Sequence, residues 1–279
     1  MCYHKSQTNS IDYLSEYYAA SYTDLMAELY STHYHENGFD FLPAAIVTAE
    51  NKNELTPYHW GFIPRWTKGI DAGLKLRVQT LNCISEEMYE KPAFRDAANE
   101  GKRCLIPCSG FFEWRWMDEK GKSKVPYFIS VPGSKLFSLA GMYTTFRDRA
   151  TDQQYHTYTV LTTRANPLME KIHNSKKRMP VIMPREYEQD WLNTSLSKDD
   201  VLALCQPLSA TIMEGHTISK LITNKKEETD VARVLEPEIY QEVLDADTGK
   251  VMEPSKPAPA NKKSPRNPAA KSDGQTELF

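Results

Sequence analysis

The spacing of apolar residues predicts helices near the start of the chain and strands after them. Residues 10–31 carry apolar residues at mixed three- and four-residue spacing, which favours helix, and Ser10 or Asp12 could cap its start. In residues 39–66, short apolar runs broken by Pro and Asn indicate strands and turns.

A second helical segment precedes a long stretch with strand character. Residues 85–100 favour helix, with Ser85 as N-cap, and Pro92 is expected to divide them into two pieces. From 103 to 162, runs rich in aromatic and β-branched residues predict strands, and residues 118–124 predict a hairpin connection. Further short elements are expected at 165–173 (helix), 178–184 (strand), 185–193 and 197–205 (helices). Together they predict one α+β domain with a twisted antiparallel sheet or barrel and peripheral helices.

The composition is typical of a globular protein, and it changes once along the chain, near the C-terminal end. Of its 279 residues, 40% are apolar and 25% are charged. No apolar run approaches the ~20 residues that span a bilayer, and the start lacks the apolar stretch of a secretory signal. A cytoplasmic protein without a membrane partner is expected. Residues 253–279 are rich in Pro and Lys, so we predict a folded domain at 1–252 followed by a disordered tail.

The cysteine and histidine pattern argues against disulfides and metal. The five cysteines form an odd set without a secretory signal, which indicates reduced thiols. Cys104 and Cys108 are four residues apart, but no second Cys/His pair with zinc-like spacing accompanies them. His4, His33 and His35 are interpreted as surface histidines. No structural metal is therefore expected, and no cofactor is expected either, since a cysteine nucleophile and an aldehyde need none.

Net charge does not by itself indicate a nucleic-acid partner. The chain carries a net charge of −3, and its tail from Pro254 to Phe279 holds five Lys/Arg against two Asp/Glu, so the rest is more acidic still. Any contact with DNA must therefore come from a local basic patch.

Cys2 is the most distinctive candidate for chemistry. Methionine aminopeptidases remove Met1 when the second residue is small, which would leave Cys2 with a free α-amine beside its thiol. The reference pKa of an α-amine is about 7.7–8.0, so a fraction is nucleophilic at neutral pH. Such a 1,2-aminothiol condenses with an aldehyde to an imine and then to a thiazolidine, which no internal cysteine can do. The alternative is that Cys2 is an incidental small residue.

Two other titratable residues suit proton transfer. Glu113 lies among aromatic residues in a strand-like stretch, where burial would raise the pKa of its carboxyl group and suit general acid–base catalysis. His173 ends a short helix and could shuttle a proton or donate a hydrogen bond. Plainer interpretations stay open, namely a solvent-facing strand residue for Glu113 and a structural or surface histidine for His173.

Aromatic and basic residues offer a local surface for nucleic acid. Trp60 and Trp66 flank a WGFIPRW segment that could stack on bases, although core packing is the commoner role of such a stretch. Asn82 could hold an amine or a carbonyl group if it is buried. A cationic run after His173 could bind phosphate or form a solvated loop, and it consists of Lys176, Lys177 and Arg178.

The order of these segments closely resembles the family named for SOS-response-associated peptidases (SRAP). The shared blocks are Met1-Cys2, WGFIPRW, Asn82 with the Ser-Glu after it, KPAFRDA, RCLIPCSGFFEW, LAGMYTTF, VLTTRAN and IHNSKKRMPVIM. The resemblance runs from Cys2 to about Asn224, where HTISKLITN looks like the family's closing strand. The GFFEW and RMPVI blocks are its most specific parts.

This resemblance implies a function in DNA damage. In that family the mature N-terminal cysteine forms a thiazolidine with the ring-opened sugar of an abasic site in single-stranded DNA. By matching blocks, Cys2 would be the nucleophile, Asn82 would position its amine or the opened sugar, and Glu113 would handle protons. His173 would hydrogen-bond the sugar and assist formation or reversal of the crosslink, and Arg178 would contact phosphate. An abasic site is mostly a closed hemiacetal, so an acid–base group must help to expose the aldehyde.

The departures from the family pattern remove arginines. The pair after Cys2 is Tyr-His in place of Gly-Arg, and the pair after Asn82 is Cys-Ile in place of Ala-Arg. We predict that the additional Lys176 and Lys177 compensate for the missing arginines. Two arginines are further candidates for contacts with the DNA backbone, Arg65 and Arg77.

The tail carries a second partner motif. Its last residues, Gln275-Thr-Glu-Leu278-Phe279, resemble the QxxLF type of motif with which bacterial replication proteins bind the sliding clamp. A Pro/Lys-rich tether would let the domain patrol single strands near a replication fork. The alternative is that these residues have no partner.

Three functions stay open. The favoured one is covalent capture of abasic sites by a monomeric, nucleoid-associated protein, with lyase-like steps. The second is a cysteine peptidase in which Cys2 works with Glu113 and His173, although only Met1 precedes Cys2, so no autocleavage is expected. The third is non-covalent binding of single-stranded DNA.

Overall fold

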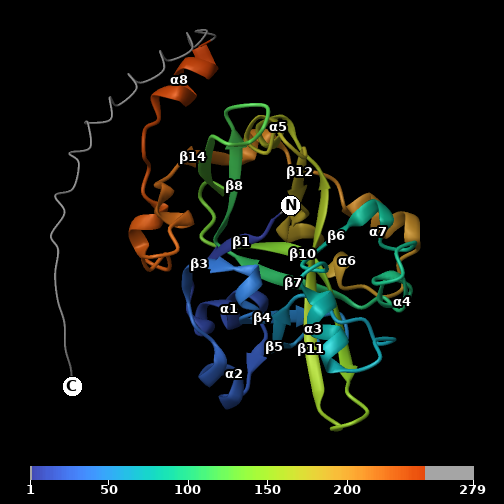
Figure 1. Cartoon of the computed structure of the whole chain (residues 1–279). Coiled ribbons are helices and arrows are strands. Elements are labelled where there is room, and N and C mark those ends of the chain that lie inside the picture. The colour runs from blue at the N-terminus through green and yellow to red at the C-terminus, as the bar shows by residue number, and fades with distance from the viewer. Residues whose placement is uncertain (1, 249–279) are drawn as a thin grey trace, which may run out of the picture.

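The fold is built around a closed barrel of five strands. A computed structural model describes residues 2–248 of the chain (Figure 1). The barrel strands are Pro43–Thr48 (β4), Glu54–Trp60 (β5), Arg103–Cys108 (β7), Phe137–Arg147 (β10) and Gln154–Arg164 (β11). Antiparallel pairing runs from β5 through β4, β7 and β10 to β11. The ring closes where Tyr158 of β11 pairs in parallel with Trp60 of β5.

A second, antiparallel sheet continues directly from the barrel. Its strands, in spatial order, are Glu214–Thr217 (β14), Lys124–Ser130 (β9), Gly110–Trp116 (β8), His4–Gln7 (β1) and His33–Asn37 (β3). Only Ser109 separates β7 from β8, so the chain passes from one sheet to the other without a loop. Glycine suits the first residue of β8, because a Cβ atom on Gly110 would lie 2.1 Å from Cζ of Phe128.

Four short strands extend the barrel sheet, one beside β5, one beside β10 and two beside β11. They are Ser21–Tyr22 (β2), Asn82–Ile84 (β6), Arg178–Pro180 (β12) and Ile182–Met183 (β13). Thr162 of β11 is paired both with Ile84 of β6 and with Pro180 of β12. Since a strand has two edges, β6 and β12 lie on opposite edges of β11 at the same level.

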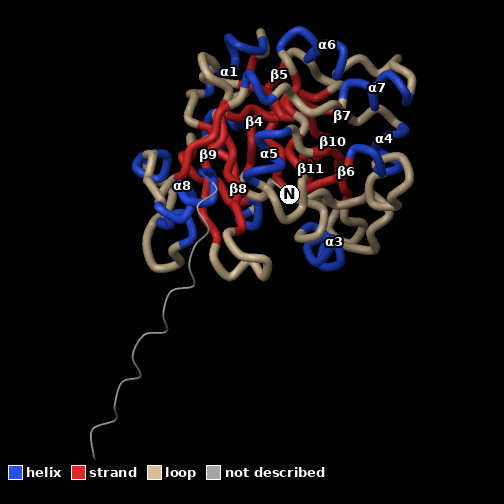
Figure 2. The backbone as a smooth tube through the Cα atoms, turned by 90° about the horizontal axis from the view of Figure 1, so that it is seen from above, coloured by secondary structure: helices blue, strands red, loops and turns tan. Residues whose placement is uncertain are grey.

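Helices lie around the barrel and beside the second sheet (Figure 1). They are Ile11–Tyr18 (α1), Asp24–Leu29 (α2), Ile70–Arg77 (α3), Arg95–Asn99 (α4), Pro167–Ile172 (α5), Glu188–Trp191 (α6), Lys198–Leu204 (α7) and Gln241–Thr248 (α8). Short 3-10 turns lie at Gly38–Asp40 (η1), Ser85–Glu87 (η2), Arg185–Tyr187 (η3), Ala210–Ile212 (η4), Lys220–Thr223 (η5) and Ala232–Leu235 (η6). The buried residues of α1, α2, α4, α6 and α7 join one apolar cluster with residues of the barrel strands. Figure 2 shows α1, α6, α7 and α4 around the edge of the strands.

A buried ion pair fixes the first strand in place. Lys5 of β1 faces Glu36 of β3 in register, and the two side chains form a salt bridge away from solvent. The Lys5 ammonium group also lies 6.0 Å from the ring centroid of Trp60. Leaving either charge buried without the other would cost several kcal/mol, roughly 3–5. The pair therefore anchors the strand that follows Cys2.

The structure confirms the α+β class and most of the predicted elements. Two helices lie within residues 10–31, and Ser10 caps the first by accepting a hydrogen bond from the backbone N–H of Tyr13. The strands within 103–162 and the hairpin at 118–124 are also confirmed. The second half of the domain follows its predicted order of short helices and strands.

The prediction of Ser85 as an N-cap was wrong, and some other predictions concern residues outside the described part of the chain. Residues 85–100 do form two helical pieces, but Ser85 is the first residue of η2, which has Ile84 at its cap position and no side-chain cap. Within 2–248, the chain contains no helix with the length and apolar character needed to cross a lipid bilayer. The predicted boundary at 252 and the tail motif lie beyond the described residues.

Candidate active site

Strand β8 buries Glu113. Because alternate residues of a strand face opposite sides, Glu113 shares a face with Phe111, which packs in the same apolar cluster as Cys2. The side chain is 4% exposed, so the solvent-facing interpretation of Glu113 is wrong. Burial raises the pKa of its carboxyl group to about 7, because desolvation disfavours the charged form. The group can therefore give or accept a proton at neutral pH.

The end of helix α5 places His173 beside Glu113. The side chain of Asn166 caps the start of α5, and His173 lies at its C-cap. Nδ1 of His173 is 2.8 Å from the carbonyl oxygen of Arg178 and 3.6 Å from Oε1 of Glu113. A carbonyl oxygen only accepts, so Nδ1 carries the ring proton. Burial lowers the pKa of His173 to about 4, so the imidazole is neutral at neutral pH.

Cys2 lies close to this pair. Its side chain is fully buried, and Sγ is 3.7 Å from the carbonyl oxygen of His4. Burial raises the pKa of the thiol well above its ordinary value, and the charge of Glu113 raises it further. The structure thus brings Cys2, Glu113 and His173 together from three distant parts of the chain. Among residues 2–248, no group of three or more His, Cys, Asp or Glu side chains is arranged to hold a metal ion.

Asn82 is buried on the short strand β6. It pairs with Val160 of β11 and is 8% exposed. Neither its Nδ2 nor its Oδ1 atom has a hydrogen-bond partner in the described part of the chain. A buried amide without partners is costly, by roughly 1–3 kcal/mol, unless a bound molecule supplies them. Asn82 therefore has the character of a ligand-binding residue.

Arg178 is already held by a carboxylate. Its Nη1 and Nη2 atoms donate to the two carboxylate oxygens of Glu86 at 2.8 and 2.7 Å, and Nη2 also donates to the carbonyl oxygen of Thr162 at 2.6 Å. A phosphate contact by Arg178 would have to compete with this bidentate pair. Glu86 follows Asn82 by four residues, so the pair ties β6 to β12 across β11.

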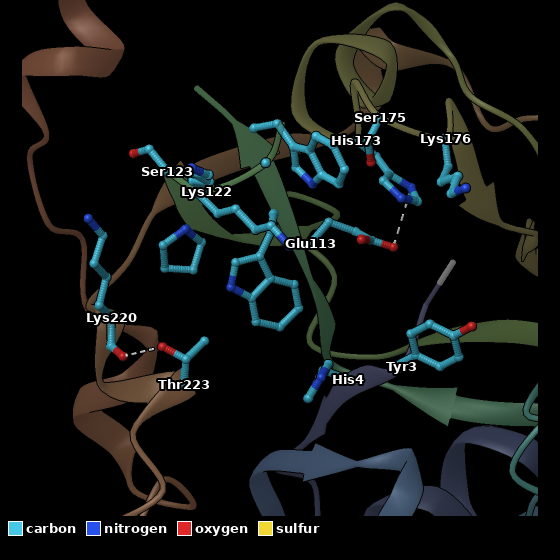
Figure 3. A pocket seen from close by; sticks show the side chains of 15 residues that line it. Tyr3, His4, Glu113, Lys122, Ser123, His173, Ser175, Lys176, Lys220 and Thr223 are labelled. Carbon is cyan, nitrogen blue, oxygen red and sulfur yellow. Dashed lines mark hydrogen bonds and ion pairs between the residues drawn. The ribbon is translucent and has the colours of Figure 1, made fainter. Parts of the chain in front are cut away.

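A cleft opens beside Glu113 and His173. Its volume is about 820 Å³. Figure 3 shows Glu113 in the middle, with His173 and Lys176 on one side and Lys122 and Lys220 on the other. Aromatic side chains complete the walls, namely Tyr3, His4, Trp114 and Trp116. Of the two lysines predicted to bind phosphate, Lys176 lines this cleft, whereas Lys177 is exposed outside it.

Of the three histidines interpreted as surface residues, one is buried and two are only partly exposed. His35 is buried, and its Nε2 atom lies 2.8 Å from Nδ1 of His4, with the two rings stacked. His33 is half-buried and forms an ion pair with Asp230. Burial lowers the pKa of His4 to about 3 and that of His35 to about 4. The antiparallel pairing of β1 with β3 creates this contact between residues far apart in the sequence.

The other predicted DNA-binding residues divide into buried and exposed ones. Trp60 is fully buried, and its Nε1–H donates to the carbonyl oxygen of Leu81, so the prediction that it stacks on bases is wrong. Arg77 donates to the carbonyl oxygen of Trp60 and covers the ring of Phe41, which gives it a structural role. Trp66 and Arg65 are exposed, the latter in an ion pair with Glu100.

Sequence reasoning missed the wall of the cleft opposite His173. Trp114 and Trp116 alternate along β8, and Lys122 and Lys124 follow in the hairpin. The signal was present as a WRW segment followed by the basic KGKSK turn. Lys220 and Thr223 reach the same cleft from η5, and nothing local indicates that contact.

Comparison with known proteins agrees with this architecture. The family model described as SOS response associated peptidase (SRAP) matches residues 1–225. Abasic site processing protein YoqW of Bacillus subtilis (strain 168) is 38% identical over 182 residues, which cover 65% of this chain and 76% of YoqW. Abasic site processing protein HMCES of Xenopus tropicalis is 28% identical over 194 residues, covering 63% of this chain and 55% of its own.

A solved structure supports the fold. The crystal structure of a protein from Bacteroides thetaiotaomicron superposes with a TM-score of 0.77 at 31% sequence identity. The match covers 85% of this chain and all of the other.

Proposed function

The chain belongs to the SOS response associated peptidase family, and from that premise we propose that it processes abasic sites in single-stranded DNA by covalent capture. Relatives named as abasic site processing proteins support the substrate. The observation that carries the chemistry is the cluster of Cys2, Glu113 and His173 beside a cleft rich in lysine and aromatic side chains.

Glu113 opens the sugar in the first step. As a carboxylate it takes the proton of the C1′ hydroxyl group, and as an acid it protonates the ring oxygen O4′. The C1′–O4′ bond then breaks and the aldehyde forms. A carboxyl group with a pKa of about 7 can act in both senses at neutral pH. His173, with its proton on Nδ1, accepts a hydrogen bond at Nε2 from the new sugar hydroxyl.

Cys2 forms the crosslink in the second step. After Met1 is removed, its α-amine attacks the aldehyde carbon, and the carbinolamine loses its hydroxyl group as water once Glu113 has protonated it. The thiol then adds to the imine carbon, and its proton ends on the nitrogen. One water molecule is released in total. Burial keeps the thiol protonated, so Glu113 also serves as the base for ring closure.

Asn82 and Arg178 position the substrate. The buried amide of Asn82 lacks protein partners and would bind a hydroxyl group or the aldehyde oxygen of the opened sugar. Arg178 holds the loop after α5 through its pair with Glu86, and its carbonyl oxygen fixes the tautomer of His173. Contact of Arg178 with phosphate would require exchange of Glu86 for the phosphate.

The directions of the pKa shifts favour capture over peptide hydrolysis. A peptidase cysteine is activated by a lowered thiol pKa, usually from a cationic histidine. Here burial raises the pKa of Cys2 and lowers that of His173. A condensation that needs a neutral amine and a positioned acid fits these shifts better than attack by a thiolate.

A denaturing gel tests the proposal. Protein whose intact mass shows the loss of Met1 is mixed with single-stranded DNA containing one abasic site. The wild type should give a shifted band that Cys2→Ala abolishes, whereas Cys205→Ala, at another buried free cysteine, should retain it. A shifted band in Cys2→Ala would reject the nucleophile. Binding seen only on a native gel would support a non-covalent binder, and hydrolysis of a peptide would support a peptidase.

We also propose that the tail motif binds the sliding clamp of the replication machinery. The support is the sequence Gln275-Thr-Glu-Leu278-Phe279. Deletion of residues 275–279 should abolish co-purification with a bacterial clamp while leaving crosslinking intact. Equal binding of the clamp by the intact and shortened chains would reject this role.

A further inference from the structure

The cleft follows an edge of β8 that has no partner strand. β9 pairs with β8 along its whole length, from Phe111 to Trp116. β1 pairs only with the start of β8, at Gly110 and Phe111. Beyond that point, the end of α5 takes the place of a strand, because the side chain of Asn174 hydrogen-bonds both the backbone N–H and the carbonyl oxygen of Trp116. Residues from both faces of β8 therefore reach one cleft.

Most cations of this cleft have no acidic partner. Within residues 2–248, no carboxylate lies within ion-pair distance of Lys122, Lys124 or Lys176, whereas Lys220 forms a long ion pair with Glu242 at 3.8 Å. The one acidic side chain in the lining is the buried Glu113. The open part of the cleft is therefore positively charged, as suits a phosphate-bearing ligand.

Trp114 presents an aromatic surface to the same cleft. Its ring makes an edge contact with His4, at 4.8 Å between centroids, and is only half-buried. Trp116, in contrast, is covered on one side by the hairpin, since a Cβ atom on Gly121 would lie 2.6 Å from its ring. Trp114 is therefore the better platform for a stacked base, and Trp116 shapes the wall.

We propose that this part of the cleft binds the nucleotide that adjoins the abasic residue on the same strand, with its base against Trp114 and its phosphate beside Lys122 and Lys220. The inference rests on the proposed function. A strand whose abasic sugar lies at Glu113 must continue away from it, and Figure 3 shows Lys122 and Lys220 across Glu113 from His173. The volume of about 820 Å³ lies within the usual range of small-molecule sites, roughly 300–1,000 Å³.

The test removes one base at a time. Three oligonucleotides carry the abasic site with both neighbouring bases, or with the 5′ or the 3′ neighbour replaced by a base-less spacer. Crosslinking rates are measured against DNA concentration. Loss of the base on one side should raise the half-saturating concentration about tenfold, the order expected for one stacked base, while the maximal rate changes less than about twofold. Equal half-saturation for all three DNAs would overturn the proposal.

Variants show whether the effect belongs to this cleft. In Trp114→Leu the sensitivity to the neighbouring base should disappear. Lys122→Ala with Lys220→Ala should raise the half-saturating concentration for all three DNAs and reduce its dependence on salt. The control pair, Lys135→Ala with Lys198→Ala, removes two exposed lysines outside the cleft and should change neither. Unchanged behaviour of the Lys122/Lys220 variant would also overturn the proposal.

Failure of the covalent chemistry would be distinguishable. The same three DNAs are titrated against Cys2→Ala, in which only non-covalent binding is measured. A base-dependent affinity there supports the subsite even if no crosslink forms in the wild type. Displacement of DNA from Cys2→Ala by an acidic peptide, with no dependence on the neighbouring base, would instead assign the cleft to a peptide and overturn the nucleotide subsite.

Discussion

Two surfaces of the molecule combine tryptophan with basic residues, and they differ in how their charges are used. Around Trp66, Arg65 is paired with Glu100, Arg147 is paired with Asp152, and the indole N–H of Trp66 donates to a backbone carbonyl group. In the cleft along β8, Lys122, Lys124 and Lys176 lack such partners within residues 2–248, and the cleft lies beside a buried acid–base pair. The two surfaces cannot be told apart by their composition. They differ in how many of their cations already form ion pairs and in how close they lie to titratable groups.

The largest expected difference between the surfaces is in catalysis. Glu113→Gln should slow crosslinking by about 100-fold or more, because the amide can neither take nor give the proton. Glu100→Gln, which only releases Arg65 on the Trp66 surface, should leave the rate within about twofold. Quenched-flow or timed gel assays at saturating DNA measure both. A Glu113→Gln enzyme as fast as the wild type would remove the acid–base role.

The buried carboxyl group of Glu113 should make stability depend on pH in a way that a single substitution removes. The pKa of Glu113 is raised from 4.5 to about 7, so the folded state holds this proton more tightly than the unfolded state. Its contribution to stability is complete below pH 4.5 and is lost as the pH rises through about 7. Glu113→Gln avoids that loss and should be more stable than the wild type at about pH 8, by on the order of 3 kcal/mol.

Denaturant titrations near pH 8 and near pH 5 check this difference. The advantage of Glu113→Gln should shrink at the lower pH, because both proteins are then uncharged at this position. Glu100→Gln, at an exposed carboxyl group, is the matched control in both titrations. An advantage of Glu113→Gln that is equal at both pH values would contradict a raised pKa.

The elements of the fold were readable from local pattern, but their contacts were not. Ser10, the strands of 103–162 and the split at Pro92 each depend on neighbours within a few residues. The Glu113–His173 contact joins residues sixty positions apart, and the His4–His35 contact depends on the pairing of β1 with β3. Family resemblance supplied the first of these pairs; nothing in the sequence supplied the second.

Trp60 and Trp66 show how closely two opposite environments can lie in one motif. Both belong to WGFIPRW, and from the sequence the same role, stacking on bases, was predicted for both. Closure of the barrel pairs Trp60 with Tyr158 and buries it completely, whereas Trp66 lies past the end of β5 and is 53% exposed. The burial of Trp60 depends on its pairing with a residue nearly a hundred positions away, which cannot be predicted from local periodicity.

Removal of the lysines after His173 should have a moderate effect on DNA binding. Lys176 lines the cleft and Lys177 does not, so Lys176→Ala should weaken binding more than Lys177→Ala. The Lys176 change should reduce the slope of log affinity against log salt by about 0.7, the value for one phosphate contact on a single strand. Fluorescence anisotropy in the Cys2→Ala background measures it. Equal, unchanged slopes in both variants would show that these lysines do not replace the missing arginines.

The smallest effect should come from the Trp66 surface. Trp66→Leu is expected to weaken DNA binding less than about threefold, below the about tenfold loss expected for a stacked base. The same anisotropy assay compares it with Trp114→Leu. If Trp66→Leu loses more affinity than Trp114→Leu, the principal surface on which bases stack lies around α3 and not in the cleft along β8.

Mass spectrometry of the crosslink can show whether Cys2 itself is covalently joined to the abasic sugar. After nuclease and trypsin digestion of the wild-type conjugate, the peptide of residues 2–5 should carry the sugar remnant with the loss of one water molecule, and fragmentation should place it on Cys2. The same remnant on a lysine peptide, such as one containing Lys176 or Lys122, or an unmodified N-terminal peptide, would contradict the account.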